Sequence, residues 1–323
     1  MNMEKHTTGF CVALIALSVH AVNLNIYVVD EAGHPVTNAV LELATEADRM
    51  GRLVDSPRMR YETWPVDEGG HVKGNFTCYS SFMHMTTKAP GFYDEYERIK
   101  FKTDGDSFFF GAHIAERRRD IKVVLRRKVN PIPMWSYSGG WPEVKMPSTK
   151  GRFGFDMVER DWVAPHGNGH VADFFIEYEE LIEGENKSYS ATIDFPNKYD
   201  GAYKKRKHAS YSFKSDYRAD EAGCYKQRFS LYSFKKSGFE YSVDSFVTKD
   251  EYPVLRTRSR VDAEGNLLGA HYSKIYGPIY AAKRFSFRTF VFNPNENDTN
   301  LEFDPERNLL SKRKKRQMGG GEP

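Results

Sequence analysis

The chain has 323 residues, 14% of them aromatic, with 19 Tyr, 23 Phe, 25 Gly and 15 Pro. Tyr and Phe favour strands, Gly and Pro favour turns, and no segment shows sustained helical periodicity, so the composition predicts an all-β protein. The formal net charge is +3, but residues 305–323 alone contribute +4. The body of the chain is therefore near neutral and lacks the basic surface of a nucleic-acid-binding protein.

Residues 1–21 have the pattern of a secretory signal peptide. Lys5 provides a short basic region, Gly9–Val19 is an apolar run, and Val19-His20-Ala21 offers small side chains where a signal peptidase reads. The run is shorter than the roughly 20 apolar residues that span a bilayer. The sequence thus predicts export to the periplasm, the cell surface or the medium, with no transmembrane anchor after cleavage.

Residues 22–129 are predicted to form a small, Ig-like β-sandwich. Short runs with alternating apolar residues recur, and turns rich in Gly or Pro separate them. The predicted strands are Leu24–Asp30, Val36–Leu43, His71–Thr77, Met83–Lys88, Tyr96–Lys102 and Asp120–Leu125.

The order of residues in this region resembles the carboxypeptidase regulatory-like, transthyretin-like sandwich. The residues that carry the resemblance are Val28, Asp30, Gly33, Pro35, Val36, Ala39, Gly70, Val72, Gly91, Tyr93 and Leu125. The resemblance implies a fold rather than an activity, because such sandwiches are accessory modules in many secreted proteins. A long insertion, Glu46–Pro65, departs from the pattern and is expected to be a surface excursion that carries Trp64.

Residues 130–150 are predicted to be a proline-rich linker. Pro131 and Pro133 lack backbone donors and favour an extended chain, and the stretch Trp135–Lys150 has no periodicity.

Residues 151–304 are predicted to form a second, larger β-sandwich or jelly-roll-like domain. Strand-like segments recur through this region and are separated by turns. Apart from the alternation of Phe153 and Phe155, they are Val171–Tyr178, Ser190–Phe195, Gln227–Ser233, Tyr241–Val247, Leu255–Val261, Ala270–Tyr276 and Phe285–Phe292. Residues 305–323 are expected to be a disordered basic tail.

This second region is also similar to a β domain in uncharacterised secreted bacterial proteins, where it follows a regulatory-like sandwich. The similar strings are Gly154–Phe174, Asp194–Gly201, Tyr272–Ile279 and Phe292–Leu310. The similarity implies an architecture and a cellular address, and it supplies no catalytic residues.

His166, His170 and Asp173 are the best candidates for metal ligands by residue type. Two histidines four positions apart share one face of a helix and can bind zinc. Pro165 and the neighbouring glycines disfavour a helix, so a Gly-rich turn that delivers Asp173 to a strand edge is the favoured interpretation.

Asp161 and Trp162 precede this loop and can form a sugar-binding platform, with an aromatic plane for stacking and a carboxylate for hydroxyl groups. The alternative, which is favoured, is that Trp162 closes the end of the sandwich while Asp161 caps a turn, because large aromatic residues dominate β cores.

The segment 293–300 is rich in oxygen ligands of the kind that Ca²⁺ prefers. The weak candidates are Asn293, Asn295, Asn297 and Asp298. Their spacing lacks the order of known calcium loops, and Asn and Asp also make turns. We therefore expect no cofactor, with calcium as the open alternative.

No catalytic motif identifies an enzyme. Glu177 and Glu179 alternate with the apolar Phe174 and Ile176 and are expected on a solvated strand face. No Gly-x-Ser-x-Gly elbow, His-Glu-x-x-His pair or Gly-rich phosphate loop occurs. A hydrolase with an unfamiliar all-β site remains a third possibility.

Two basic runs, Arg117–Arg119 and Lys204–His208, can bind an anionic polysaccharide but are expected to be solvated loops. Cys78 and Cys224 fall in different predicted domains, so unpaired thiols are favoured over a disulfide.

Taken together, these patterns predict an exported, non-catalytic binding or structural protein. Its expected partner is a polysaccharide or a cell-envelope protein. The alternative is a glycan-binding accessory protein that uses Trp162 and the loop carboxylates.

Overall fold

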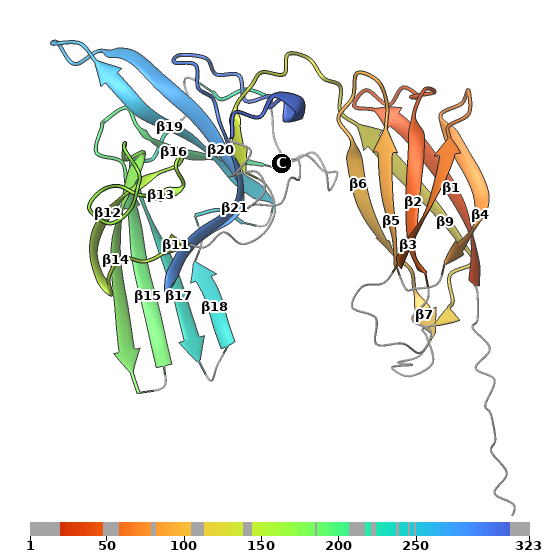
Figure 1. The fold of residues 1–323 in the computed structure, drawn as a ribbon, viewed down its shortest axis with the longest axis horizontal. Helices are drawn as coiled ribbons and strands as arrows, with labels where there is room; N and C mark the ends of the chain where they lie inside the picture. Colours follow the sequence, from red (N-terminus) through yellow and green to blue (C-terminus); the bar gives the residue numbers. More distant parts are fainter. Residues whose placement is uncertain are drawn as a thin grey trace, which may run out of the picture. The chain divides into compact units, whose positions relative to one another are not determined.

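The computed structural model describes residues 20–47, 58–78, 82–104, 113–137, 144–184, 186–206, 217–220, 224–236, 239–244, 246–248 and 250–310. The chain divides into a smaller unit, Met1–Lys128, and a larger unit, Val129–Pro323. Within the described residues both units are built from β-strands (Figure 1). The predicted all-β sandwich fold is therefore confirmed.

The smaller unit has two main sheets. One has the order β4-β1-β9, in which β1 and β9 run parallel, and the other has the antiparallel order β3-β2-β5-β6. The strands are β1 (His20–Asp30), β2 (Val40–Ala47), β3 (Arg58–Pro65), β4 (His71–Cys78), β5 (Phe82–Lys88), β6 (Glu95–Lys100) and β9 (Arg118–Leu125). A short pair, β7 (Thr103–Asp104) and β8 (His113–Ile114), forms a separate ribbon. Apart from His20 and Ala21, which begin β1, the predicted signal peptide lies outside the described residues.

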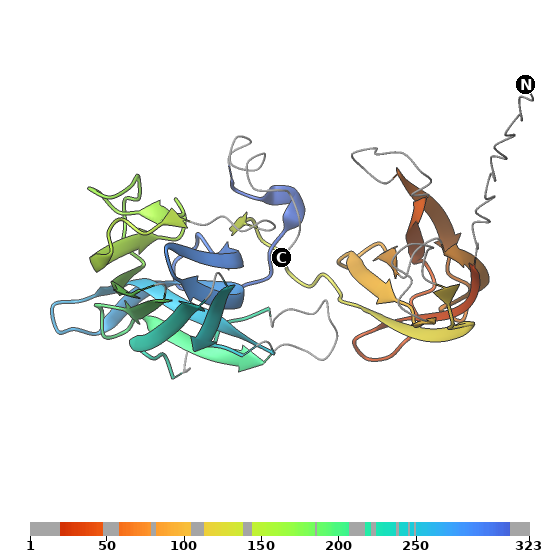
Figure 2. The ribbon, with the colours of Figure 1, turned by 90° about the horizontal axis from the view of Figure 1, so that it is seen from below.

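Alternate residues of the two sheets face each other and form the core of the smaller unit. In β1, Val22, Leu24, Ile26 and Val28 are all fully buried. The opposite sheet contributes Leu41, Leu43, Met83, Met85 and Ile99 to the same cluster. Seen from below in Figure 2, the strands of this unit lie in two layers. Strict alternation explains why the sequence revealed these strands.

The expected surface excursion 46–65 instead contributes a strand. β3 pairs with β2, and Trp64 lies opposite Leu41 in this pairing. The Trp64 ring packs against Phe76, with 4.8 Å between ring centroids, and against the core of the unit. Burial of the large indole stabilises the added strand. Residues 48–57 of the insertion lie outside the described residues.

Two matching turns end strands in this unit. The side chain of Asp30 accepts hydrogen bonds from the backbone N–H groups of Ala32 (3.0 Å) and His34 (2.9 Å). Asp67 does the same with the N–H groups two and four positions on. Each turn needs a glycine with positive φ, Gly33 at 87° and Gly70 at 77°.

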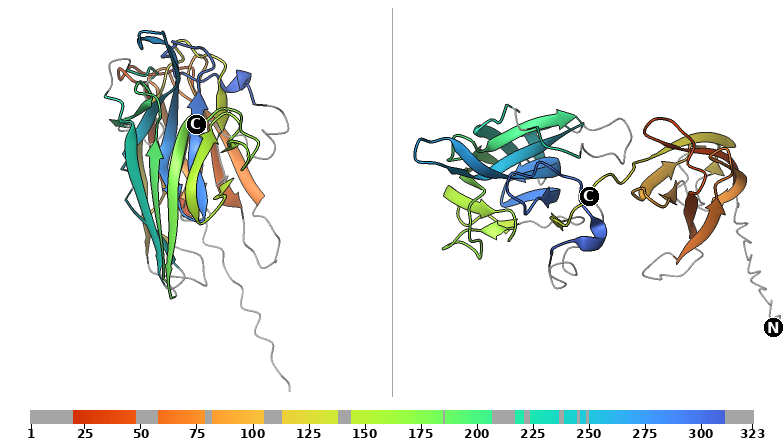
Figure 3. Two further views of the ribbon diagram at one scale, coloured as in Figure 1. Left: turned by 90° about the vertical axis from the view of Figure 1, so that its left-hand side faces the viewer. Right: turned by 90° about the horizontal axis from the view of Figure 1, so that it is seen from above.

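The larger unit also consists of two main sheets. One has the order β13-β12-β14-β15-β17-β18, and the other has the order β10-β21-β20-β19-β16 with β11 added to β21. The first sheet contains β12 (Lys150–Asp156), β13 (Asp161–Trp162), β14 (Phe174–Glu183), β15 (Asn186–Asp194), β17 (Arg228–Lys236) and β18 (Phe239–Asp244). The second contains β10 (Trp135–Tyr137), β11 (Val144–Lys145), β16 (Gly201–Arg206), β19 (Glu251–Val261), β20 (Leu267–Ala281) and β21 (Arg284–Phe292). Figure 3 (left) shows the long green and teal strands of the first sheet side by side.

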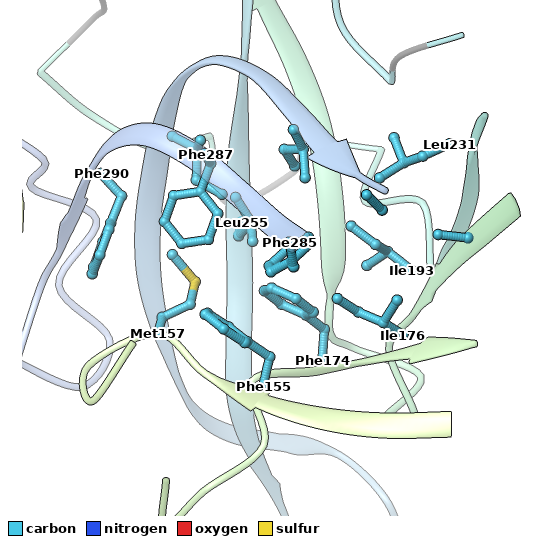
Figure 4. Packing of buried hydrophobic residues seen from close by; sticks show 14 of the residues in the cluster. Phe155, Met157, Phe174, Ile176, Ile193, Leu231, Leu255, Phe285, Phe287 and Phe290 are labelled. Atoms are coloured by element: carbon cyan, nitrogen blue, oxygen red, sulfur yellow. The ribbon is translucent and has the colours of Figure 1, made fainter. Parts of the chain in front are cut away.

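Aromatic residues dominate the core between these two sheets. Phe155 of β12 stacks on Phe174 of β14 and meets Phe285 of β21 edge-on, with ring centroids 5.6 Å and 5.0 Å away (Figure 4). Ile193 and Leu255 complete the contact between the sheets. Edge-to-face contacts add to the stabilisation from burial.

The segment expected to be a linker is part of the larger unit. β10 and β11 both pair with β21, and Ile132, between the two prolines, donates its N–H to the carbonyl of Glu302 at 3.0 Å. The carboxylate of Glu302 accepts the N–H groups of Val129 and Asn130 at 2.8 and 2.6 Å. Proline spacing alone could not reveal these partners, because all of them lie more than about 130 positions further along the chain.

The first residues of the expected basic tail are also folded. Pro305–Arg307 forms a 3₁₀ turn capped by Asp304, and Leu310 is buried in the larger core. Residues 311–323 lie outside the described residues. This turn is the only helix in the part of the chain that the structure describes, so no helical segment there is long and apolar enough to cross a membrane.

The two glycine turns allow a matched test of stability. A Cβ at Gly70 would lie 2.8 Å from Pro35 Cβ and 2.9 Å from the Val28 carbonyl oxygen, whereas a Cβ at Gly33 would meet nothing within 4 Å. Gly33→Ala adds only backbone strain, about 1 kcal/mol of unfolding free energy, while Gly70→Ala is expected to cost about 3 kcal/mol. Urea denaturation followed by circular dichroism measures both, and equal costs would contradict the turn geometry.

Candidate functional site

The Gly-rich loop between β13 and β14 is held by Asp161. One of its carboxylate oxygens accepts the N–H of Trp162 at 2.8 Å. The other accepts both the backbone N–H and the side-chain amide of Asn168, at 2.8 and 3.1 Å. Gly167 passes so close that a Cβ there would lie 2.5 Å from the Asp161 carboxylate. Asp161 therefore caps the loop, as the favoured interpretation expected.

Trp162 belongs to the core. Its side chain is 2% exposed, its ring centroid lies 5.3 Å from that of Phe155, and its Nε1 donates to the carbonyl of Lys145 at 2.8 Å. With its ring faces covered and its only donor satisfied, this indole offers no surface for a sugar.

The two histidines of the loop are both exposed. The His166 ring stands edge-on to Phe153, with 5.1 Å between centroids. His170 donates its backbone N–H to Asp156. No group of three or more His, Cys, Asp or Glu side chains that could hold a metal ion occurs among the described residues. The structure thus does not gather His166, His170 and Asp173 into one set of ligands.

Asp173 faces inward and binds Arg258. The guanidinium donates through Nε to Oδ1 at 2.8 Å and through Nη2 to Oδ2 at 2.9 Å, which is a bidentate pair. Thr257 Oγ1 and the Met157 N–H donate to the same carboxylate, at 2.9 and 2.8 Å. Both oxygens of this fully buried carboxylate are therefore occupied by the protein's own donors.

Asp156 is the second carboxylate of this cluster. It accepts Arg258 Nη2 at 3.1 Å and the backbone N–H groups of four loop residues, Val158, Glu159, His170 and Val171. Burial raises the pKa of Asp156, but these N–H groups and the charge of Arg258 outweigh it and lower the pKa below its usual value. We call Asp156, Asp173, Thr257 and Arg258 the Arg258 network.

Arg258 reaches these carboxylates because the backbone of β19 is distorted. The register between β19 and β20 shifts between Thr257 and Arg260, and Arg258 has φ of 55°, a left-handed conformation that costs about 1–2 kcal/mol in a non-glycine residue. The guanidinium also lies 4.9 Å from the centre of the Phe292 ring. Alternation alone would place the Arg258 side chain on the outer face of the sheet. The bulge instead turns it toward the buried acids.

Asp200 lies next to the network. It is 5% exposed and accepts the backbone N–H of Ser259 at 3.1 Å. Burial is the main cause that raises the pKa of Asp200 to about 6.

The calcium candidates in 293–300 build a turn. Asn293 is fully buried and donates to the carbonyls of Asp298 and Asn300, at 2.9 and 2.7 Å, while its Oδ1 accepts the N–H of Asn295. Asn297 donates to and accepts from the backbone of β20. Asp298 accepts the N–H of Asn300 at 2.9 Å. The side-chain oxygens of Asn293 and Asn297 and one carboxylate oxygen of Asp298 are thus engaged in hydrogen bonds, and calcium binding here stays an untested alternative.

The remaining sequence candidates lie on surfaces. Glu177, on the outer face of its sheet, pairs with Arg152 and Arg228, and Glu179 pairs with Lys150. These are solvent-exposed ion pairs of small energetic value.

The free thiol of Cys224 is exposed. β16 includes the first part of the basic run Lys204–His208, and β9 begins within the run Arg117–Arg119.

Sequence reasoning identified Asp161 and Asp173 but missed Asp156, Thr257 and Arg258. The sequence carries one signal, which is that Arg256, Arg258 and Arg260 occupy alternate positions of β19. In the structure, Thr257 between the first two is fully buried. Regular alternation would leave all three arginines on one face. Only the bulge separates Arg258 from the others.

Comparison with known proteins gives no assignment. No protein-family model matches the chain, and no curated protein is similar enough to count as a relative. Several solved structures show faint similarity, and two of them serve as examples. One is a 3-chlorocatechol 1,2-dioxygenase from Rhodococcus opacus, with TM-score 0.26, 12% identity, and coverage of 35% of this chain and 62% of that one. The other is a putative membrane-associated protein of unknown function from Bacteroides fragilis, with TM-score 0.19, 9% identity, and coverage of 87% and 99%. Neither similarity carries an argument about fold or function.

The Arg258 network is expected to stabilise the larger unit. Asp173→Asn leaves the Arg258 guanidinium with one acid fewer in a buried site, which is expected to lower the unfolding free energy by about 3 kcal/mol. Glu296→Gln is the matched control, because Glu296 forms a bidentate pair with Arg260 at 2.6 and 2.7 Å on an exposed surface. Urea denaturation should show little change for this control. Equal losses would contradict the structural role of the network.

The raised pKa of Asp200 predicts a specific pH dependence of the unfolding free energy. Its pKa of about 6 lies above the usual 3.8, so unfolding releases a proton between these values and the unfolding free energy falls as pH rises through the window. Asp200→Asn removes this titration. The unfolding free energy of this variant minus that of wild type is expected to increase by about 2–3 kcal/mol as the pH is raised from about 4 to about 7. Parallel stability curves for the two proteins across that range would show that Asp200 is not shifted.

Proposed function

We propose that this chain is an exported, non-catalytic binding protein. The proposal depends chiefly on one observation. The three acids of the candidate site, Asp156, Asp161 and Asp173, each accept hydrogen bonds from the protein's own groups on both carboxylate oxygens. A general acid or base must reach a substrate proton, and a metal ligand must have a free lone pair.

The hydrolase alternative finds less support. Asp156 and Asp173 are two buried carboxylates near each other, but Arg258 bridges them. A glycosidase pair instead faces an open space that holds the sugar and a water molecule. The network therefore has a structural role, because its hydrogen bonds and ion pairs connect the Gly-rich loop to β19.

The exported location in this proposal is based on residues 1–21. Their basic start, apolar run and small residues before Val22 suit export by a signal peptidase pathway. Val22 is the first fully buried residue of β1. Cleavage after Ala21 would therefore preserve the entire core of the smaller unit.

The smaller unit supports a docking or spacer role. Its resemblance to carboxypeptidase regulatory-like sandwiches is part of the proposal, and the turns at Asp30 and Asp67 are in keeping with it. A polysaccharide or a cell-envelope protein is the proposed partner class, and nucleic acid is not.

The export part is tested by expressing the full chain in a Gram-negative host. We expect a processed protein in the periplasm whose first residue is Val22, as read by N-terminal sequencing. Leu14→Arg, which places a charge in the apolar run, should keep the chain unprocessed in the cytoplasm. An intact wild-type chain in the cytoplasm would refute export.

The non-catalytic part is tested with the processed chain. Polysaccharides incubated with it are expected to show no new reducing ends. Release of reducing ends that Asp173→Asn abolishes would contradict the proposal.

A further inference from the structure

The outer face of the sheet β3-β2-β5-β6 carries exposed aromatic rings. These four strands lie side by side in Figure 1. Leu41, Leu43, Met83 and Met85 point into the core, so the residues between them point outward. On β3 and β6 this outer face carries Tyr61 and Tyr96, which are 69% and 58% exposed. Exposed rings of this size on a sheet face are typical of a binding surface.

Strand register places Tyr61 and His84 in one row across the sheet, and Tyr96 lies on the same face opposite Thr86 of β5. Ala44 of β2 lies directly between Tyr61 of β3 and His84 of β5, and His84 lies beside Arg98 of β6. Neighbouring strands are about 4.8 Å apart, so Tyr61 and His84 are separated by about 10 Å across the small side chain of Ala44. This spacing suits the length of an oligosaccharide lying across the strands.

The rings at the β6 side are held in place. The His84 and Tyr96 rings stack with 5.7 Å between centroids and an interplanar angle of 24°, and His84 Nδ1 and the Tyr96 hydroxyl are hydrogen-bonded. The Arg98 guanidinium lies 4.0 Å from the centre of the Phe82 ring. Rings and cation that are already ordered lose little conformational entropy when a ligand binds.

The β6 side of this face is positively charged. Lys88 pairs with Glu42 at 2.9 Å and is thereby neutralised. Arg98 and Lys100 of β6 are exposed. Arg119 donates to the Lys100 carbonyl but pairs with Glu116 at 3.7 Å, so it adds no net charge to this edge. An anionic ligand is therefore favoured over a neutral one.

We propose that this aromatic face, formed by Tyr61, His84, Tyr96 and Arg98 with the adjacent Lys100, binds an anionic polysaccharide. The apolar C–H faces of the sugar rings stack on the tyrosines, and Arg98 and Lys100 bind the acid groups. This inference rests on the proposed binding function and names its ligand class. It moves the glycan site from the buried Trp162 to a surface of the smaller unit.

The ring arm of the test measures binding of the processed chain to polygalacturonate, dextran sulfate and neutral dextran by affinity electrophoresis and calorimetry. Wild type should bind the two anionic polymers and not dextran. Tyr61→Ala with Tyr96→Ala should weaken binding about ten-fold or more, because two stacking contacts are lost. The Phe double variant keeps the rings and should stay within about two-fold of wild type. Tyr232→Ala, an exposed tyrosine of the larger unit, should have no effect.

The charge arm compares two double variants that remove the same charge. Arg98→Ala with Lys100→Ala should weaken binding and flatten its dependence on salt between about 0.05 and 0.5 M NaCl. Lys73→Ala with Lys122→Ala, on the outer face of the other sheet, should behave as wild type. Urea denaturation confirms that each variant is folded.

Three outcomes would overturn the inference: no binding by wild type, equal binding of neutral dextran, or binding that the tyrosine variant leaves unchanged. The last would mean simple ion exchange and would leave the broader binding function standing. A chain that is never exported, or one that cleaves polysaccharide, would instead refute the proposed function.

Discussion

The buried contact of Arg258 with Asp156 and Asp173 connects parts of the larger unit that are distant in the sequence. One carboxylate ends β12, the other precedes β14, and the arginine comes from a bulge in β19 of the opposite sheet. Burying these charges is costly unless every one is paired and hydrogen-bonded. The loop backbone and Thr257 supply the remaining donors, so the geometry of the Gly-rich loop follows from satisfying two acids.

The need to pair buried polar groups also distinguishes, in both units, the side chains that hold the fold together from those that face solvent. Polar groups at the loops are used internally, in the Arg258 network, in the turn after β21 and in the turns at Asp30 and Asp67. Side chains on the outer face of β3-β2-β5-β6 keep ring faces and charges in contact with solvent. A residue type that suits chemistry is therefore a poor guide to function until its partners are known. This is why the proposed ligand surface lies away from the acids and histidines of the loops.

Much of the fold could be predicted from local patterns. Alternation in β1, β14 and β21 revealed strands, because one face of each is buried and the pattern has a period of two. The insertion 46–65 predicts an excursion, and only the tertiary packing of Trp64 on Phe76 makes part of it the strand β3. The prolines of segment 130–150 predict a linker, whereas its hydrogen-bond partners, such as Glu302, lie far along the chain and make it part of the larger unit. Of the candidate site, Asp161 and Asp173 were found by residue type, but their roles were set by partners.

The amino-acid sequence by itself determined the all-β class, the glycine turns and the near-neutral body, because each depends on composition or on neighbours a few positions apart. Tertiary structure alone decided that Trp162 is core, that Arg258 lies between two acids, and that Tyr61, His84 and Tyr96 share a surface. Each of these depends on strand register or on a single inserted residue. A shift of one residue in register exchanges the inner and outer faces of a strand, and local sequence does not specify which partner sets that register.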